Sequence, residues 1–433
     1  MSKQFFCFII FTSLICCIFS SCSTVGSEIS LSPSSQTTVQ TENYEGSLYF
    51  ANQHSGSGAA GENGYYDYNT SANGGVVIMY TDYTTKVRIP LCTAPNCQHN
   101  NESCTAWYEY TGGGMLPIVC NNKLVLAVNG ASSVIKQDSE NIKPHIEVMD
   151  LNGSNKKILF SLPNDLSFSK PFVLYDDGFY CLCSRTQLNA DNQETISNYE
   201  LIKFDIKNST FSILSQIDAI ASYLGGFTED SLLIRIVDVN ENEGGIPEER
   251  DSILKYNLLT NSSQEIFSWL PSEAAGYLIN DNVYKIDKTG GELHQFNCTT
   301  EESNNLGAIY DPKNPPASIL IKDIIDQKLI FEEIYVGENS TSTNYFSFDL
   351  SLLQRQDLTL KTNNTMHDMP LTILAETETQ LLVTPSIQMS TVNVESVTGE
   401  LLSIPWLSYD YALLSKSDYW ANRPNYIKIQ EIF

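Results

Sequence analysis

The sequence predicts an all-β protein, and within that class a β-propeller of seven four-stranded blades, with six or eight blades as alternatives. A strand–turn–strand pattern with an acidic or Asn-containing turn recurs about every fifty residues, the scale of one blade. No long amphipathic helical pattern follows residue 22. Strands also do not alternate with helices, which argues against a two-lobed α/β solute-binding fold.

The clearest unit is residues 146–162, where apolar residues alternate up to Asp150 and again after the turn. Asn152 and Gly153 lie between the two apolar runs. Both residue types tolerate the positive φ that a type I′ turn requires, so this segment predicts a β-hairpin.

The same strand-and-turn unit recurs along most of the chain, and a ring of such units leaves few open sheet edges. A ring is therefore preferred to a β-sandwich. The fifth unit, residues 277–296, is compressed. Residues 48–50 and 411–414 are expected to share the blade that closes the ring. Taking Asp150 as the marker of the turn, the corresponding positions are Asp82, Asp205, Asn257, Asp287, Asp349 and Glu395.

The first 21 residues are predicted to be a signal peptide, with Lys3 followed by an apolar run over residues 5–19. Ser20-Ser21-Cys22 resembles the lipobox of bacterial lipoproteins, although Phe19 stands where that family prefers Leu. The resemblance implies that Cys22 carries the lipid and becomes the first mature residue. An ordinary secretory signal is the alternative.

Residues 22–44 are expected to form a lipidated, Ser/Thr-rich flexible tether, and residues 45–433 the propeller domain. A lipid anchor with no second apolar span predicts a protein held on the cell membrane and facing outside the cytoplasm.

The chain has a formal net charge of −26, from 25 basic and 51 acidic residues. Such a surface repels phosphate backbones and anionic lipids. Nucleic acid is therefore excluded as a partner, and membrane attachment is expected to depend on the lipid anchor on Cys22.

Cys92, Cys97, His99 and Cys104 form a C-x4-C-x-H-x4-C run. Three thiolates and an imidazole can complete a tetrahedral zinc site. Disulfide bonds are the preferred interpretation for a protein outside the cytoplasm, and free thiols are a third possibility. In each case we expect the cluster to hold a loop in a fixed conformation and to have no role in catalysis.

The cysteine–histidine run and the segment at residues 417–420 resemble those of propeller lipoproteins from gut-dwelling Firmicutes. The turn pattern is similar to that of LRP-like and TolB-like propellers. These resemblances imply a location and a fold, and they imply no activity.

Asp238, Asn240, Asn242 and Glu249 are spaced like ligands of a calcium loop. Glu243 occupies the position where such a loop needs glycine, so a solvated acidic loop is the preferred reading and calcium the alternative.

The sequence contains no P-loop, GxSxG, HExxH or dinucleotide-binding motif. No cofactor is expected apart from possible zinc or calcium. We expect a membrane-tethered, non-catalytic propeller that binds an unknown protein or glycan through blade loops or the channel. The alternatives are a carbohydrate-active propeller enzyme, with carboxylates from separate blades, and a solute-binding or structural envelope protein.

Overall fold

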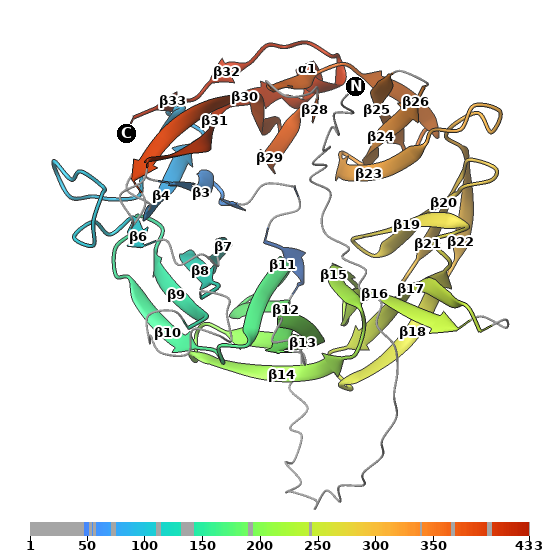
Figure 1. Ribbon diagram of the computed structural model, residues 1–433, viewed down its shortest axis with the longest axis horizontal. Helices are drawn as coiled ribbons and strands as arrows, with labels where there is room; N and C mark the ends of the chain where they lie inside the picture. The colour runs from blue at the N-terminus through green and yellow to red at the C-terminus, as the bar shows by residue number, and fades with distance from the viewer. Residues whose placement is uncertain are drawn as a thin grey trace, which may run out of the picture. The chain divides into compact units, whose positions relative to one another are not determined.

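The computed structural model confirms an all-β protein whose seven four-stranded blades form a ring (Figure 1). It describes residues 47–51, 54, 58–70, 75–109, 114–130, 143–188, 194–241, 245–337, 340–364, 369–395 and 401–432. Cys22 and the predicted signal peptide and tether lie outside these residues and remain predictions. Within the described part of the chain, no helix has the length and apolar character needed to cross a membrane.

The strands of each blade run in chain order from the ring axis outward. Blade 1 comprises β2 (Ala59–Ala60), β3 (Gly64–Thr70), β4 (Gly75–Asp82) and β5 (Val87–Pro90). Blade 2 comprises β7 (Met115–Cys120), β8 (Lys123–Val128), β9 (His145–Asp150) and β10 (Lys157–Ser161). Blade 3 comprises β11 (Leu166–Tyr175), β12 (Gly178–Leu188), β13 (Glu194–Asp205) and β14 (Thr210–Ile217).

Blades 4 to 6 follow the same order. Blade 4 comprises β15 (Ala221–Phe227), β16 (Ser231–Glu241), β17 (Pro247–Asn257) and β18 (Ser262–Trp269). Blade 5 comprises β19 (Ala274–Ile279), β20 (Asn282–Asp287), β21 (Glu292–Asn297) and β22 (Ser303–Ala308). Blade 6 comprises β23 (Ser318–Ile325), β24 (Lys328–Val336), β25 (Thr341–Asp349) and β26 (Gln354–Leu358).

Blade 7 is built from β29 (Thr372–Glu376), β30 (Gln380–Glu395), β31 (Leu401–Ser415) and β32 (Ile427–Lys428). Two short strands, β27 (Lys361–Asn364) and β28 (Met369–Pro370), precede it, and β27 pairs in parallel with β30. The short helix α1 (Lys416–Trp420) connects β31 to the C-terminal segment, and the Ser415 side chain caps it by accepting from the Asp418 amide.

The prediction that residues 48–50 and 411–414 share the blade that closes the ring is wrong. β1 (Tyr49–Phe50) pairs with β11 of blade 3, far from residues 411–414, which lie in β31 of blade 7. The C-terminal segment closes the ring instead. It supplies β32 as the outer strand of blade 7, and then β33 (Gln430–Glu431) pairs in parallel with β5 of blade 1. Since β2 already completes blade 1, no N-terminal strand is needed in blade 7.

The recurrent Asp or Asn ends the third strand of most blades, where its side chain holds the turn. Asp349, for example, accepts hydrogen bonds from the Ser351 and Leu352 amides. Two markers differ from the prediction, because Asp287 and Glu395 end second strands. In blade 5 the third strand ends at Asn297, which caps its turn in the same way through the Thr299 and Thr300 amides.

The apolar core is divided among the seams of the ring. Each of seven clusters of buried side chains lies between two successive sheets, for example between blades 3 and 4 around Leu201 and Tyr256. Cys181 and Cys183 on β12 belong to the cluster between blades 2 and 3, as core residues. The side chains of strands alternate between two buried faces, which explains the nearly continuous apolar strands.

Candidate metal centre and binding surface

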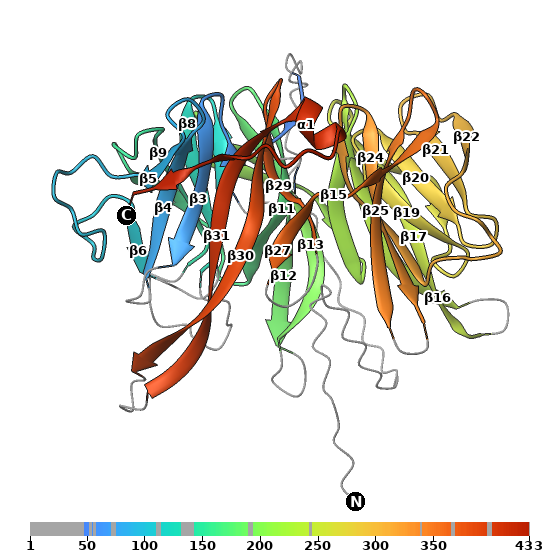
Figure 2. The same cartoon turned by 90° about the horizontal axis from the view of Figure 1, so that it is seen from above.

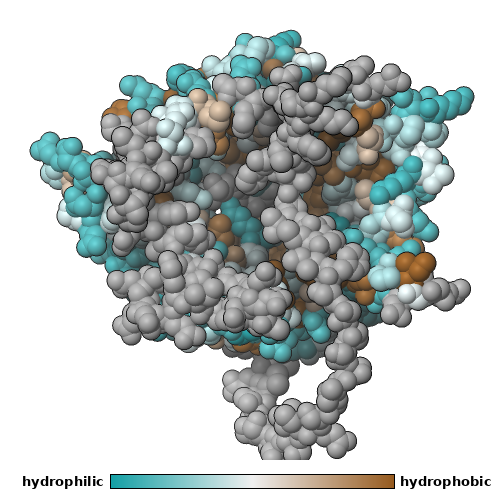
Figure 3. Space-filling model, viewed as in Figure 1, coloured by the Kyte–Doolittle hydropathy of each residue, from teal (hydrophilic) through white to brown (hydrophobic). Residues whose placement is uncertain are grey.

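The outer strand of blade 1 is split into β5 and β6 (Trp107–Glu109), which both pair with β4. The residues between them, 91–106, form an insertion that leaves and rejoins the sheet at one point. The Leu91 amide donates to the Ile78 carbonyl at 2.8 Å, and the Ile78 amide donates to the Ala106 carbonyl at 2.9 Å. Figure 1 shows this insertion projecting from the outer edge of the ring, and Figure 3 shows that its visible surface is mostly hydrophilic.

The insertion brings together all four residues of the predicted cluster. The ligand atoms of Cys92, Cys97, His99 and Cys104 lie within 4.8 Å of one another, and His99 Nδ1 lies 3.2 Å from Cys104 Sγ. No disulfide joins any of the seven cysteines that the structure describes. Among the described residues, this group has the donor set and convergence needed to hold a metal ion.

Local turns give the insertion its shape. Asn96 and His99 adopt positive φ, and the Asn101 carboxamide accepts from the Ser103 amide and hydroxyl. The Cys104 amide donates to the Asn101 carbonyl. Burial lowers the pKa of His99, which keeps the imidazole neutral and able to act as a ligand.

The candidate calcium ligands that the structure describes do not share one face of the sheet. Asp238 and Asn240 lie on β16 and Glu249 on β17, and these strands pair as a hairpin. Glu249 pairs with Val239, so its side chain lies on the opposite face of the sheet from those of Asp238 and Asn240. Asn242 lies outside the described residues.

A group of charged side chains lies at the ends of the innermost strands of blades 6 and 7, which we call the axial cluster. His54 bridges two carboxylates, with Nδ1 2.8 Å from Asp323 and Nε2 3.4 Å from Glu376. Lys416 of α1 pairs with Glu376 and, at 2.8 Å, with Asp326. This site could not be predicted from the sequence, because its residues are up to 362 positions apart and share no motif.

The charges of the axial cluster stabilise one another. Burial lowers the pKa of His54, but the hydrogen bonds that His54 donates to Asp323 and Glu376 outweigh this effect and raise the pKa to about 9. Burial raises the pKa of Glu376, and its bonds from His54 and Lys416 bring the value below the usual range. Both residues are therefore ionised at neutral pH.

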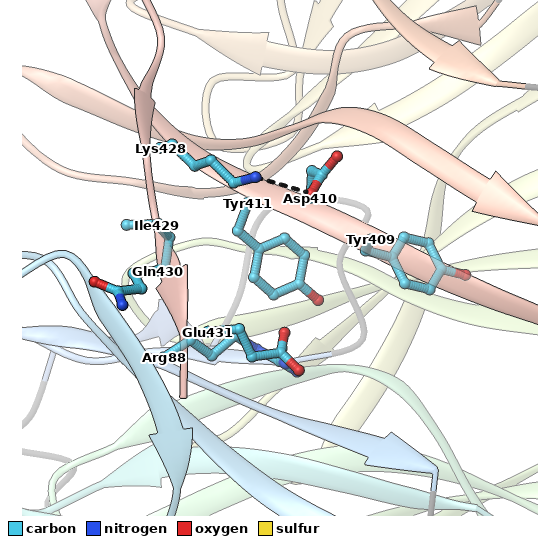
Figure 4. Close-up of a pocket in the computed structure, with 8 residues that line it drawn as sticks. All are labelled: Arg88, Tyr409, Asp410, Tyr411, Lys428, Ile429, Gln430 and Glu431. Atoms are coloured by element: carbon cyan, nitrogen blue, oxygen red, sulfur yellow. Dashed lines mark hydrogen bonds and ion pairs between the residues drawn. The ribbon is translucent and has the colours of Figure 1, made fainter. Parts of the chain in front are cut away.

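A cavity of about 450 Å³ lies at the seam between blades 7 and 1 (Figure 4). Buried Arg88 contacts Asp67 at 3.1 Å and Glu431 at 2.8 Å, and the Tyr411 hydroxyl donates to Asp67 at 2.7 Å. The cavity is lined by Arg88, Tyr409, Asp410, Tyr411, Lys428, Ile429, Gln430 and Glu431.

The hairpin of β30 and β31 extends from this seam beyond the neighbouring strands (Figure 2). Its strands contain 16 and 15 residues. Met389 pairs with Leu407 and Ile387 with Tyr409, so these four side chains share one face. Met389, Leu407 and Tyr409 are 45%, 41% and 46% exposed, which leaves an apolar strip facing solvent.

No family model matches the chain, and no curated protein matches it. Among solved structures, the chain is similar to a puromycin hydrolase mutant, with 9% identity and a TM-score of 0.47 over 87% of this chain. The match covers 53% of the hydrolase, so the chain spans about half its length.

The chain is also similar to TolB from Acinetobacter baumannii, with 11% identity, a TM-score of 0.31 and 79% of each chain covered. A chain of a nidogen/laminin complex shows 10% identity and a TM-score of 0.29, over 72% of this chain and 92% of that one. These similarities concern fold alone. The class of protein defined here is a seven-bladed β-propeller, and that assignment depends on the strand order described above.

Proposed function

We propose that the chain is a membrane-tethered propeller, anchored by a lipid on Cys22 and facing outside the cytoplasm, that binds a partner protein without catalysis. The observation that carries the binding proposal is the projecting hairpin of β30 and β31 with its exposed apolar strip. The hairpin adds length that the ring itself does not need.

The hairpin offers an open sheet edge. β32 pairs with Ala412 and Leu413 of β31, and among the described residues β30 is the other strand that pairs with β31. Of the strands that the structure describes, none pairs with the outer side of residues 404–410 of β31. Such an edge is a template for a further strand.

The occupant that fits this edge is an extended segment of a partner protein. Backbone hydrogen bonds to β31 supply affinity, and alternate side chains of the segment contact the strip. The exposed Met389, Leu407 and Tyr409 favour apolar residues at every second position. The net charge of −26 favours a partner whose surrounding surface is basic.

The axial cluster supports a binding role over a glycosidase role. Glycoside hydrolysis requires one carboxyl group that stays protonated and a second that is ionised. Asp323 and Glu376 both contact the His54 imidazolium, and Glu376 also pairs with Lys416. The histidine occupies the space between the carboxylates, and its contacts tie residue 54 to blades 6 and 7.

The binding proposal is tested by selecting peptides from a random display library on the purified protein and measuring their affinity by titration. Selected peptides should alternate apolar residues, and Leu407→Asp or Tyr409→Asp should weaken binding at least about tenfold. Val336→Asp, at an exposed apolar position of β24, is the matched control. Peptides that bind both hairpin variants as well as the parent, or ligands found only among glycans, would refute the hairpin as the site.

The tether is tested separately by metabolic labelling with palmitate. Cys22→Ala should abolish incorporation and release the protein from membranes. Label retained by this variant would overturn the lipid-anchor proposal and leave the hairpin proposal intact.

A further inference from the structure

We propose that Cys92, Cys97, His99 and Cys104 bind one Zn²⁺ ion in a closed structural site that fixes the insertion in blade 1. This inference does not depend on the proposed partner. The four ligand atoms lie within 4.8 Å of one another. Zinc–sulfur and zinc–nitrogen bonds of the usual lengths place ligand atoms about 3.5–4 Å apart. The His99 Nδ1 to Cys104 Sγ distance of 3.2 Å is already close to this range.

Backbone amides support the sulfur atoms. The Ala94 amide donates to Cys92 Sγ, and the Ala106 amide donates to Cys104 Sγ. Each donor is two residues after its cysteine. Hydrogen bonds of this kind stabilise thiolates and orient them toward a shared cation.

The surroundings also balance the charge of the site. Three thiolates and one Zn²⁺ ion carry a net charge of −1. Lys156 interacts electrostatically with Cys104. Its ammonium group also pairs with Glu147 at 3.9 Å and lies 3.5 Å from the centre of the Tyr108 ring. The Tyr108 hydroxyl donates to Glu147 at 2.7 Å, which holds the ring in place. We infer that Lys156 is a positioning residue that favours the metal-bound form.

Four protein ligands leave no open position for water or substrate, so the site is structural. A disulfide would join two of the cysteines and leave the third beside His99. A metal ion uses all four donors at once, in agreement with their convergence. Because the sheet ladder is interrupted between β5 and β6, a central ion supplies the cross-links that the insertion lacks.

The site also lies against blade 2. Cys92, Cys97 and Cys104 pack in the cluster that joins blades 1 and 2. The Tyr66 hydroxyl donates to the Leu151 carbonyl in the turn between β9 and β10, at 3.2 Å. Ordering of the insertion should therefore stabilise this seam as well as the loop.

The test is metal analysis of the full chain purified under reducing conditions in the presence of zinc. The expected content is about one zinc per chain, with the absorption of tetrahedral cobalt bound to thiolates after exchange for cobalt. Cys97→Ser and His99→Ala should lose the metal. Cys298→Ala, a buried cysteine of blade 5, should retain it.

Two further measurements cover variants that fail to fold. A chelator should lower the melting temperature of the parent protein, and zinc, but not magnesium, should restore it. Lys156→Met should keep the stoichiometry and weaken zinc affinity about 10–100-fold. A parent chain without zinc, a disulfide within the cluster, or a metal retained by Cys97→Ser would each overturn the proposal.

Discussion

His54 Nδ1 lies 2.8 Å from Asp323 Oδ2, although 269 residues separate them in the chain. This contact joins the segment that follows β1 to the innermost strand of blade 6. With the second contact to Glu376, His54 connects three parts of the ring that share no sheet ladder. Residue 54, which lies between β1 and β2 in the chain, is therefore held against blades 6 and 7.

Replacing His54 by Ala should destabilise the protein by about 3 kcal/mol, since it leaves Asp323 without the cation that compensates its burial. Chemical denaturation measures the change. His294→Ala is the control, because its contact to Glu292 is at 3.6 Å between partly exposed side chains and should contribute about 0–1 kcal/mol. Equal effects of the two substitutions would contradict a structural role for His54.

The stability of the protein should fall as the pH rises from about 6.5 to 9. The pKa of His54 is raised from 6.5 to about 9, so the folded state binds this proton more tightly. The stabilisation is complete below pH 6.5 and is lost as the pH passes 9, with a total on the order of 3 kcal/mol.

The pH effect is measured as unfolding free energy against pH in the parent and in His54→Gln. The gap between the two curves should be constant below pH 6.5 and should shrink toward pH 9. The neighbouring Lys416 has a raised pKa and stays charged over this range. Parallel curves up to pH 10 would rule out His54 as the titrating group.

Arg88→Met should destabilise the seam between blades 7 and 1 by about 3–5 kcal/mol, because fully buried Asp67 loses its cationic partner. Burial already raises the pKa of Asp67, so the variant should also lose stability as the pH rises. The control is Arg250→Met, whose surface partner is Glu265. Calorimetry in which both variants melt with the parent would disprove the importance of this pair.

Gly153→Ala should cost about 1–3 kcal/mol. Gly153 has a φ of +82°, and a Cβ there would lie 2.5 Å from the Leu91 carbonyl at the start of the insertion. Gly114→Ala separates the two causes, since Gly114 has a φ of +79° and open space around it. Thermal unfolding should show the larger loss for Gly153→Ala, and the reverse order would exclude the close contact.

The blade repeat could be predicted from sequence because its signal is local. Asp205 and Asn257 each accept amide hydrogen bonds within their own turn, so the residue type and the turn coincide. The same locality explains the error in blade 5. Asp287 caps the turn after a second strand through the Thr289 amide, and Asn297 does so after the third strand through Thr299. An Asp or Asn that caps a turn can follow a second strand as well as a third, so the residue type does not show which strand of the blade has ended.

The candidate metal centre was also predictable, because all four donors lie within one short run. Choosing among disulfide bonds, a metal ion and free thiols requires knowing whether the four side chains meet in space. The spacing of the residues in the sequence does not show this. The axial cluster and the Arg88–Glu431 contact were not predictable, since ring closure brings their residues together across most of the chain.

The insertion in blade 1 begins and ends at the same point of the outer strand, between β5 and β6. Leu91 and Ala106 hydrogen-bond to the carbonyl and the amide of the same residue, Ile78, so the chain resumes the sheet where it left it. A short link between these two ends should let β5 and β6 run on as one strand, with loss of the contacts that Cys104 makes in the core between blades 1 and 2. The insertion can thus be shortened or exchanged for another loop while the strand order of the ring is kept.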